Sequence, residues 1–267
     1  MQIVKLEGNS NASVITVPDL EPGPGQVVVQ TAGSALCGSE LHGYRDDGME
    51  TGNSGHEAAG VVAAIGEGVT TLQEGQRVGV SAVVGCGNCD RCAKGQLTWC
   101  ANHTVQTGMH AEQFLSAARA CHPLPDDVSW DAGVLLSGDG LGVPYHTSRK
   151  LLAEDIESVA IFGAGPIGLG NTLVQSWLGR RVIAVDVLAN RLETATALGA
   201  AEVVNASEGD AVEQIRELTG GVGADACIEA AGRPDTALAC FSAVRIAGTV
   251  VFNGEQGELP LSPSTHF

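Results

Sequence analysis

Positive charge is scarce in this sequence. Its only lysines are Lys5, Lys94 and Lys150, and 31 Asp and Glu residues against 14 Lys and Arg leave a formal net charge of −17. A surface of this sign repels phosphate backbones and anionic lipid, so we expect no nucleic acid or membrane partner. It does not exclude a dinucleotide, because the backbone N–H groups of a helix N-terminus bind phosphate without basic side chains.

Aromatic residues and long apolar runs are also few. Phe, Trp and Tyr make up 4% of the residues, and no apolar stretch approaches the roughly 20 residues of a membrane span. The length of 267 residues suggests two domains. Residues 1–7 lack the apolar run of a signal peptide, so a cytoplasmic protein is expected. A core of Val, Ala, Leu and Ile with 36 glycines is typical of β-barrel or α/β proteins.

The first half of the chain contains short β-type runs separated by turns. The runs cover residues 3–6, 12–17, 26–31, 58–65 and 77–84, and Glu21-Pro-Gly-Pro-Gly25 is typical of the turns between them. Many short strands with glycine turns predict a small barrel or sandwich.

Four of the eight cysteines crowd into residues 86–100, at Cys86, Cys89, Cys92 and Cys100. Three thiols at a spacing of three, with a fourth eight residues further on, can wrap one loop around a tetrahedral zinc ion. Sulfur then fills every ligand position, so this zinc would be structural. The alternative is a redox or disulfide cluster, which is rare in the cytoplasm.

A second candidate metal site lies upstream of these cysteines. The stretch reads Cys37-Gly38-Ser39-Glu40-Leu41-His42 and, after a polar connection, Gly55-His56-Glu57. Thiolate and imidazole are preferred zinc ligands, and no Cys-x-x-Cys pair is present here to close a structural knuckle. Catalytic zinc takes three ligands from distant segments and keeps one position open. The alternative is a half-buried cysteine and two surface histidines in a glycine-rich loop.

Together, these ordered motifs resemble those of the zinc-dependent medium-chain alcohol and polyol dehydrogenases, and the resemblance extends over nearly the whole chain. It implies a GroES-like β-barrel catalytic domain at residues 1–147, with the structural-zinc lobe at residues 86–100. The roles that it implies are catalytic zinc ligands at Cys37 and His56, a proton relay of Ser39 and His42, an acidic residue behind the ligands at Glu40, and a carboxylate next to the zinc at Glu57.

The resemblance also implies one further ligand, a Cys or Glu in the segment that leads into the nucleotide domain. Counting back from Tyr145-His146 places Asp139 at this position. An Asp departs from the family pattern, although it carries one negative charge, as a thiolate does, on a harder oxygen donor. Because the Asp side chain is shorter, the alternatives are that a water takes this bond or that Glu57 is the ligand. A turn or helix N-cap is the alternative role for Asp139.

Three further histidines, His103, His110 and His122, have no evident partner in the sequence. We expect each to face solvent or to be hydrogen-bonded within the fold.

From residue 158 onward, strand and helix patterns alternate. The apolar run 158–162 leads into Gly163-Ala164-Gly165-Pro166-Ile167-Gly168, whose glycines allow a tight turn, close approach of a pyrophosphate and close packing of helix on strand. The next predicted strand ends at Asp186, where a carboxylate binds ribose hydroxyls and repels a 2′-phosphate, which favours NAD over NADP. Arg191 could stack on the adenine or pair with Asp186.

The pattern predicts a doubly wound parallel (Rossmann) domain at residues 148–267, with further strands at 202–205, 223–230 and 248–253 and helices at 211–218 and 236–244. In the order 3-2-1-4-5-6, the sixth strand is missing at Phe267. In the family this strand usually makes the contact of a homo-oligomer, and without it the strand at 249–252 would be an uncovered edge.

The leading functional hypothesis is a zinc-dependent oxidoreductase that transfers a hydride between NAD and a small secondary alcohol or polyol, with two zinc ions per chain. A zinc-independent quinone or enone reductase is one alternative, but it would need NADPH and no Cys37/His56 pair. The other is a truncated, non-catalytic remnant that binds dinucleotide or zinc.

Overall fold

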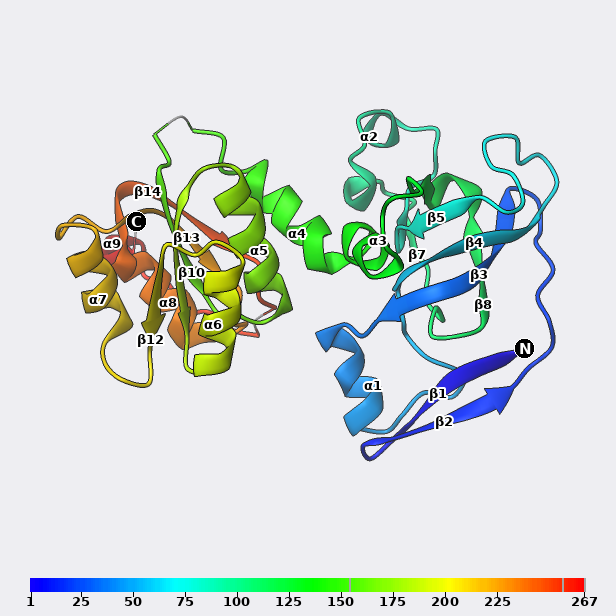
Figure 1. Ribbon diagram of the computed structural model, residues 1–267, viewed down its shortest axis with the longest axis horizontal. Coiled ribbons are helices and arrows are strands. Elements are labelled where there is room, and N and C mark those ends of the chain that lie inside the picture. The colour runs from blue at the N-terminus through cyan, green and yellow to red at the C-terminus, as the bar shows by residue number, and fades with distance from the viewer. Residues whose placement is uncertain (154, 256, 267) are drawn as a thin grey trace. The chain divides into compact units, whose positions relative to one another are not determined.

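The computed structural model describes residues 1–153, 155–255 and 257–266, and its chain divides into two compact units, Met1–Asp139 and Gly140–Phe267 (Figure 1). The division falls at the start of helix α4 (Asp139–Ser148), whereas the sequence suggested a boundary near its end. Phe267, the last residue of the predicted second domain, lies outside the described residues.

The first unit is built on an antiparallel sheet with the strand order β8-β3-β4-β5-β9. Its core contains Val27, Val29, Val62 and Val78. Val27 and Val29 lie on the same face of β3, because successive side chains of a strand point to opposite faces. A hairpin of two further strands, β1 and β2, precedes the sheet. The bounds are β1 Gln2–Gly8, β2 Asn11–Thr16, β3 Gln26–Ala35, β4 Glu57–Ile65, β5 Arg77–Val80, β8 Gln113–Ala117 and β9 Cys121–Pro123.

The strand predicted at residues 77–84 is divided in the structure. β5 ends at Val80, and β6 (Val83–Val84) pairs instead with β7 (Thr104–Val105). Between β6 and β7 the chain forms the cysteine lobe, which contains the short helices α2 (Asp90–Ala93) and η2 (Leu97–Trp99). The other helices of this unit are η1 (Gly38–Glu40), α1 (Leu41–Arg45), η3 (Ala118–Ala120) and α3 (Trp130–Ser137).

The second unit contains a parallel sheet with the strand order β12-β11-β10-β13-β14, which confirms the 3-2-1-4-5 part of the predicted order (Figure 1). One face packs its apolar side chains against α5, and the other packs against α7 and α8. The bounds are β10 Ser158–Phe162, α5 Pro166–Trp177, β11 Arg181–Asp186, α6 Ala189–Ala197, β12 Glu202–Asn205, α7 Ala211–Leu218, β13 Ala224–Glu229, α8 Pro234–Ala243, β14 Val244–Phe252 and α9 Pro263–His266.

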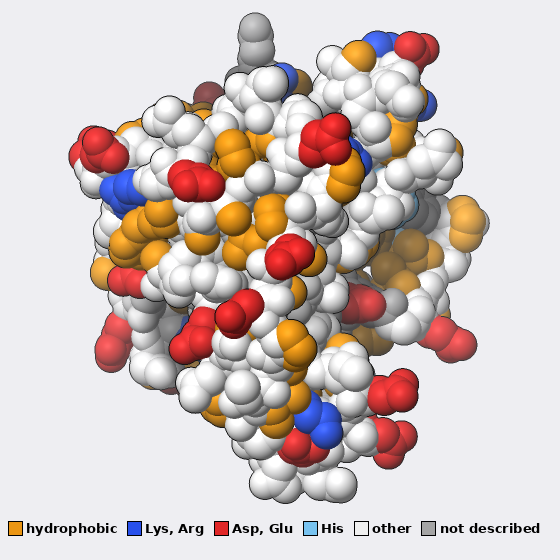
Figure 2. Space-filling view, turned by 90° about the vertical axis from the view of Figure 1, so that its right-hand side faces the viewer, with side chains coloured by type: hydrophobic (Ala, Val, Ile, Leu, Met, Phe, Trp, Pro, Cys, Tyr) orange, Lys and Arg blue, Asp and Glu red, His pale blue; other side chains and the backbone are white. Residues whose placement is uncertain are grey.

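The charge of the surface agrees with the composition. On the face drawn in Figure 2, acidic side chains are spread widely and basic side chains are few. No helix within the described ranges is both long enough and apolar enough to cross a bilayer.

Candidate functional site

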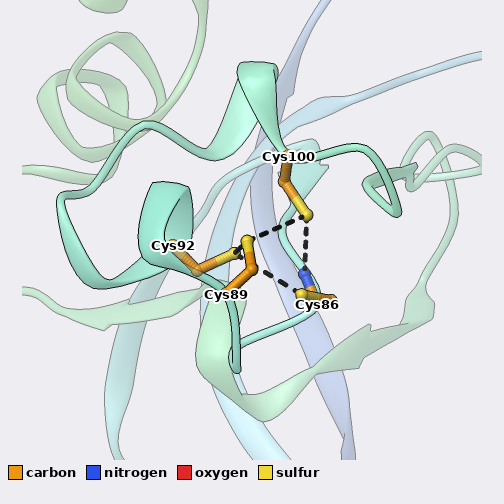
Figure 3. A group of neighbouring side chains, drawn as sticks. All are labelled: Cys86, Cys89, Cys92 and Cys100. Atoms are coloured by element: carbon orange, nitrogen blue, oxygen red, sulfur yellow. Dashed lines mark hydrogen bonds between the residues drawn. The ribbon is translucent and has the colours of Figure 1, made fainter.

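The four lobe cysteines converge on one point (Figure 3). Cys92 Sγ lies 3.9 Å from Cys86 Sγ and 3.6 Å from Cys89 Sγ, and Cys89 Sγ lies 3.8 Å from Cys100 Sγ. A zinc–sulfur bond of about 2.3 Å in a tetrahedron separates neighbouring sulfurs by about 3.8 Å. The spacing therefore fits a zinc ion coordinated by these thiolates.

Backbone N–H groups of the lobe donate to its sulfurs. The N–H of Cys86 points at Cys100 Sγ, and that of Gly87 at Cys92 Sγ, each over 3.4 Å. The Cys86 N–H lowers the pKa of Cys100 to about 6, so this sulfur is a thiolate at neutral pH. In spite of the Gly87 N–H, burial and the neighbouring sulfurs raise the pKa of Cys92 to about 11, so this thiol would lose its proton on metal binding.

A second cluster gathers Cys37, His56, Glu57 and Asp139, and one ligand atom of each lies within 4.8 Å of those of the others. Asp139 Oδ2 lies 3.7 Å from Cys37 Sγ and 3.6 Å from His56 Nε2. These separations fit neighbouring positions around one tetrahedral zinc, which are about 3.4–3.6 Å apart for mixed sulfur, nitrogen and oxygen ligands.

Three separate parts of the fold supply this cluster. Cys37 is the N-cap residue of η1, just after β3, and His56 immediately precedes β4. Asp139 is the first residue of α4. Because Ala35 at the end of β3 pairs with Glu57 at the start of β4, the sheet itself brings Cys37 and His56 together.

The His56 ring is oriented for metal binding. Its Nδ1 lies 2.9 Å from the Ser54 carbonyl oxygen, to which it donates, and this leaves Nε2 facing Cys37 and Asp139. Hydrogen bonding to Asp139 raises the pKa of His56 to about 10 in spite of its burial. His56 is therefore protonated at neutral pH when no ion is present, and a metal ion would displace that proton.

The two carboxylates of the cluster differ in their surroundings. Glu57 is buried, and its Oε2 accepts the backbone N–H of Asp139 over 3.1 Å. Asp139 is 46% exposed, and its hydrogen bond to His56 lowers its pKa. Gly138 makes room for Glu57, because a Cβ at Gly138 would lie 2.2 Å from Glu57 Oε2. Glu57 thus fixes the start of α4, and Asp139 presents the more accessible oxygen.

The two predicted relay residues lie outside this four-residue cluster. Ser39 is exposed in η1. His42 is 88% exposed in α1, and its Nδ1 lies 3.3 Å from Asp46 Oδ2. Their part in proton transfer stays a prediction.

The resemblance placed Glu40 behind the candidate ligands, but sequence reasoning missed its partner His110. Glu40 is buried, and it accepts the Cys37 N–H through Oε1 and faces His110 Nε2 at 2.8 Å through Oε2. The three-residue spacing of Cys37 and Glu40 is that of a capping box, which could have indicated the first bond. No local signal identifies His110, because it lies 70 residues from Glu40 in the chain.

The glycine-rich turn of the second unit follows β10. Gly163 has a φ of +96°, which favours glycine, and Gly165 and Pro166 are the N-cap and first residues of α5. Gly168 packs against the turn so closely that a Cβ would lie 1.7 Å from the Gly163 carbonyl oxygen. A Cβ at Gly165 would meet no atom within 4 Å, and Gly165 lines a cavity, so the N-terminus of α5 is accessible to an anionic ligand.

A cavity of about 670 Å³ lies beside this turn, and Asp186 is one of its lining residues. Asp186 accepts the backbone N–H groups of Ala164, Val187 and Leu188, and Arg191 Nη1 lies 3.7 Å from its Oδ2. Of the predicted cofactor residues, the cavity is lined by Gly163, Gly165, Asp186 and Arg191, whereas the first turn of α5 contains Pro166, Ile167 and Gly168.

Two family profiles match the chain. Residues 23–126 match the alcohol dehydrogenase GroES-like domain, and residues 166–267 match the zinc-binding dehydrogenase family.

Individual proteins of known name are similar over most of their length. A probable D-xylulose reductase A of Aspergillus clavatus is 31% identical over 89% of this chain and 70% of its own. The structure of an alcohol dehydrogenase from Thermus sp. ATN1 superposes with a TM-score of 0.89 at 29% identity, covering 99% of this chain and 81% of that one. An alcohol dehydrogenase from Escherichia coli CFT073, solved with NADH, has a TM-score of 0.88 at 27% identity and covers 100% and 80%, respectively.

Proposed function

Because this chain belongs to the zinc-binding dehydrogenases with an alcohol dehydrogenase GroES-like domain, we propose that it transfers a hydride between a secondary alcohol or polyol and NAD. The observation that carries this proposal is the convergence of Cys37, His56 and Asp139 on one point. In the reaction the alcohol loses a hydride from its carbinol carbon and a proton from its hydroxyl, and NAD⁺ accepts the hydride. The three similar proteins are named as a D-xylulose reductase and two alcohol dehydrogenases, which supports this substrate class.

The ligand cluster supplies the electrostatics of the reaction. When bound, zinc provides Lewis acidity, which lowers the pKa of a hydroxyl far below its value in water. Cys37, His56 and Asp139 would hold the ion, while Glu57 keeps the backbone of Asp139 in place. Three ligands that include two anions leave one tetrahedral position for the substrate.

Two exposed side chains would conduct the proton. Ser39 would accept it from the substrate hydroxyl, and His42 would release it to solvent. The 88% exposure of His42 and its contact with Asp46 suit the outer end of such a relay.

The cavity at Asp186 supports NAD as the cofactor. The Asp186 carboxylate lies at the end of β11. There it would accept hydrogen bonds from the ribose hydroxyls of NAD and repel the 2′-phosphate of NADP. Arg191 Nη1 lies 3.7 Å from this carboxylate and partly offsets its charge.

We assign the second zinc ion to the lobe, where it would stabilise the fold without taking part in the reaction. All eight cysteines of the chain are free thiols in the structure, which suits a reducing cytoplasm.

The test is the rate of NADH formation on a panel of secondary alcohols and polyols. The His56→Ala variant should lose turnover by at least about a hundredfold, because an open metal site depends on each ligand. The His122→Ala variant is the matched control, since His122 is exposed on β9, and it should keep wild-type turnover. Full turnover in His56→Ala, or NADH binding by the wild type without turnover on the panel, would refute the proposal.

A further inference from the structure

The buried carboxylate of Glu40 lies directly behind the ligands. It is 1% exposed, and its two oxygens face different partners. Oε1 accepts the Cys37 N–H over 2.9 Å and lies 4.0 Å from His56 Nδ1, whereas Oε2 lies 2.8 Å from His110 Nε2. A buried carboxylate is stable only when its oxygens are hydrogen-bonded, so the donor at Oε2 decides how Glu40 is held.

His110 is itself held on several sides. Its side chain is 11% exposed, and its Nδ1 lies 2.9 Å from Ser34 Oγ. Its backbone N–H donates to Asn53 Oδ1, and its carbonyl oxygen accepts the N–H of Val4. Because an ionised Glu40 can only accept, His110 Nε2 is the donor, and in the neutral imidazole Nδ1 then accepts the hydroxyl hydrogen of Ser34.

The same ring touches the segment that carries His56. Gly55 precedes His56, and a Cβ at Gly55 would lie 2.7–2.8 Å from the His110 ring. The ring thus occupies the space that a side chain would need at this position. His110 therefore contacts the chain next to one ligand and, through Glu40, the backbone of another.

We propose that His110 is a positioning residue of the metal site, which holds Glu40 and the chain at Gly55 so that Cys37 and His56 face the same ion. This inference rests on the proposed function only in taking the cluster of Cys37, His56 and Asp139 as a zinc site. His110 does not contact the reacting atoms in this role. Partners that lie behind metal ligands typically contribute 10–100-fold to metal affinity.

The test measures zinc affinity by competition with a chelator, without substrate or cofactor. In His110→Phe, which keeps an aromatic side chain and removes both nitrogens, zinc binding at the Cys37 cluster should weaken by about 10–100-fold. In His110→Gln the side-chain amide can still donate to Glu40, so much of the affinity should return. His122→Phe is the matched control and should bind zinc as the wild type does.

Cobalt substitution gives a second, spectroscopic readout. Cobalt bound at the Cys37 cluster should show a shifted visible band in His110→Phe, because the thiolate and imidazole are no longer fixed at the same angle. The cobalt spectrum of the lobe, recorded in the Cys37→Ser background, should not change. A residue with a purely structural role would lower the melting temperature and leave the zinc affinity and the band at the Cys37 cluster unchanged.

Three results would overturn the inference: wild-type zinc affinity in His110→Phe, equal losses in the Phe and Gln variants, or additive effects of His110→Phe and Glu40→Gln. If His110→Phe does not fold, Ser34→Ala replaces it, because it frees Nδ1 by changing one exposed side chain. Unchanged affinity and an unchanged band in Ser34→Ala would then overturn the inference. A wild-type chain that binds no zinc at Cys37 would instead refute the proposed function.

Discussion

Asp139 and Glu57 show how local bonding gives two neighbouring carboxylates different roles. Glu57 is buried and accepts the Asp139 N–H, whereas Asp139 lies close to both the thiol of Cys37 and the imidazole of His56. Only one oxygen is needed beside sulfur and nitrogen to complete a three-ligand zinc site. The more exposed Asp139 is therefore the better candidate for the third ligand.

Replacement of each carboxylate by its amide distinguishes the two roles. Asp139→Asn should weaken zinc binding at the Cys37 cluster by more than about a hundredfold, because it removes an anionic ligand. Glu57→Gln should weaken it by only about tenfold, as expected for a group that orients a ligand. Chelator competition measures both affinities, and the reverse order would make Glu57 the third ligand.

Asp186 is expected to determine the choice of cofactor. Asp186→Asn keeps an oxygen that accepts backbone N–H groups and removes the charge that repels a 2′-phosphate. The ratio of kcat/KM for NADP to that for NAD should rise by about tenfold or more, which corresponds to about 1.4 kcal/mol. Asp235→Asn is the control, since Asp235 lines the same cavity and is paired with Arg233, and it should leave the ratio unchanged. An unchanged ratio in Asp186→Asn would contradict the assigned role.

At the scale of single elements, two helical glycines of the second unit have opposite surroundings. A Cβ at Gly168 in α5 would collide with the Gly163 carbonyl oxygen, whereas a Cβ at Gly142 in α4 has no atom within 4 Å. The close approach at Gly168 packs α5 against the glycine-rich turn. The glycine at 142 has no such constraint.

Alanine substitutions at these two glycines should therefore change the stability of the protein in opposite directions. Gly168→Ala should destabilise the protein by about 1–3 kcal/mol through overpacking and weaken NADH binding. Gly142→Ala should stabilise it by about 0.5–1 kcal/mol, because alanine favours the helix. Denaturant unfolding and NADH fluorescence titration measure these effects. A neutral Gly168→Ala would show that the turn is not tightly packed.

The start of β10 is joined to β13 and β14 through Asp225. Its carboxylate accepts the N–H and hydroxyl groups of Ser158 and pairs with Arg245 Nε at 2.7 Å. Burial raises the pKa of Asp225, but these bonds together lower it by more than burial raises it. The folded-state pKa therefore lies below the ordinary value of 3.8. The stabilisation is fully present above that ordinary value and is lost as the pH falls through the folded-state pKa.

Asp225→Asn should consequently destabilise the protein at neutral pH by about 1–3 kcal/mol. The difference from wild type should shrink as the pH falls from about 3.8 toward the lower folded-state pKa, because the carboxylate is protonated first in the unfolded chain and then in the folded one. Urea unfolding at a series of pH values measures this difference. A difference that does not change with pH would show that the charge of Asp225 contributes nothing.

For the whole molecule, the sequence predicted most of the second unit because its signals are local. The strand 202–205 and the helix 211–218 have the predicted bounds, and the strand order follows from the doubly wound pattern. In the first unit the predicted strand 77–84 breaks after Val80, since β6 pairs with a strand beyond the cysteine lobe. Such long-range pairing has no signal within the run itself.

The candidate site shows the same limit. Spacing alone grouped the lobe cysteines, and the resemblance to a family indicated Asp139 beside Cys37 and His56, which the structure brings together. The contact between Glu40 and His110 joins residues that are 70 positions apart in the chain. It forms because the fold brings η1, which contains Glu40, against the loop before β8, which contains His110. No periodicity or spacing encodes such a contact, so only the three-dimensional structure reveals it.

Zinc content per purified chain is the most direct test of the central claim that two separate clusters bind zinc and that one of them performs the chemistry. The wild type should contain two zinc ions per chain, and Cys37→Ser should contain one, keep its fold and lose turnover. A Cys37→Ser variant that retains both ions together with full alcohol oxidation would contradict the account.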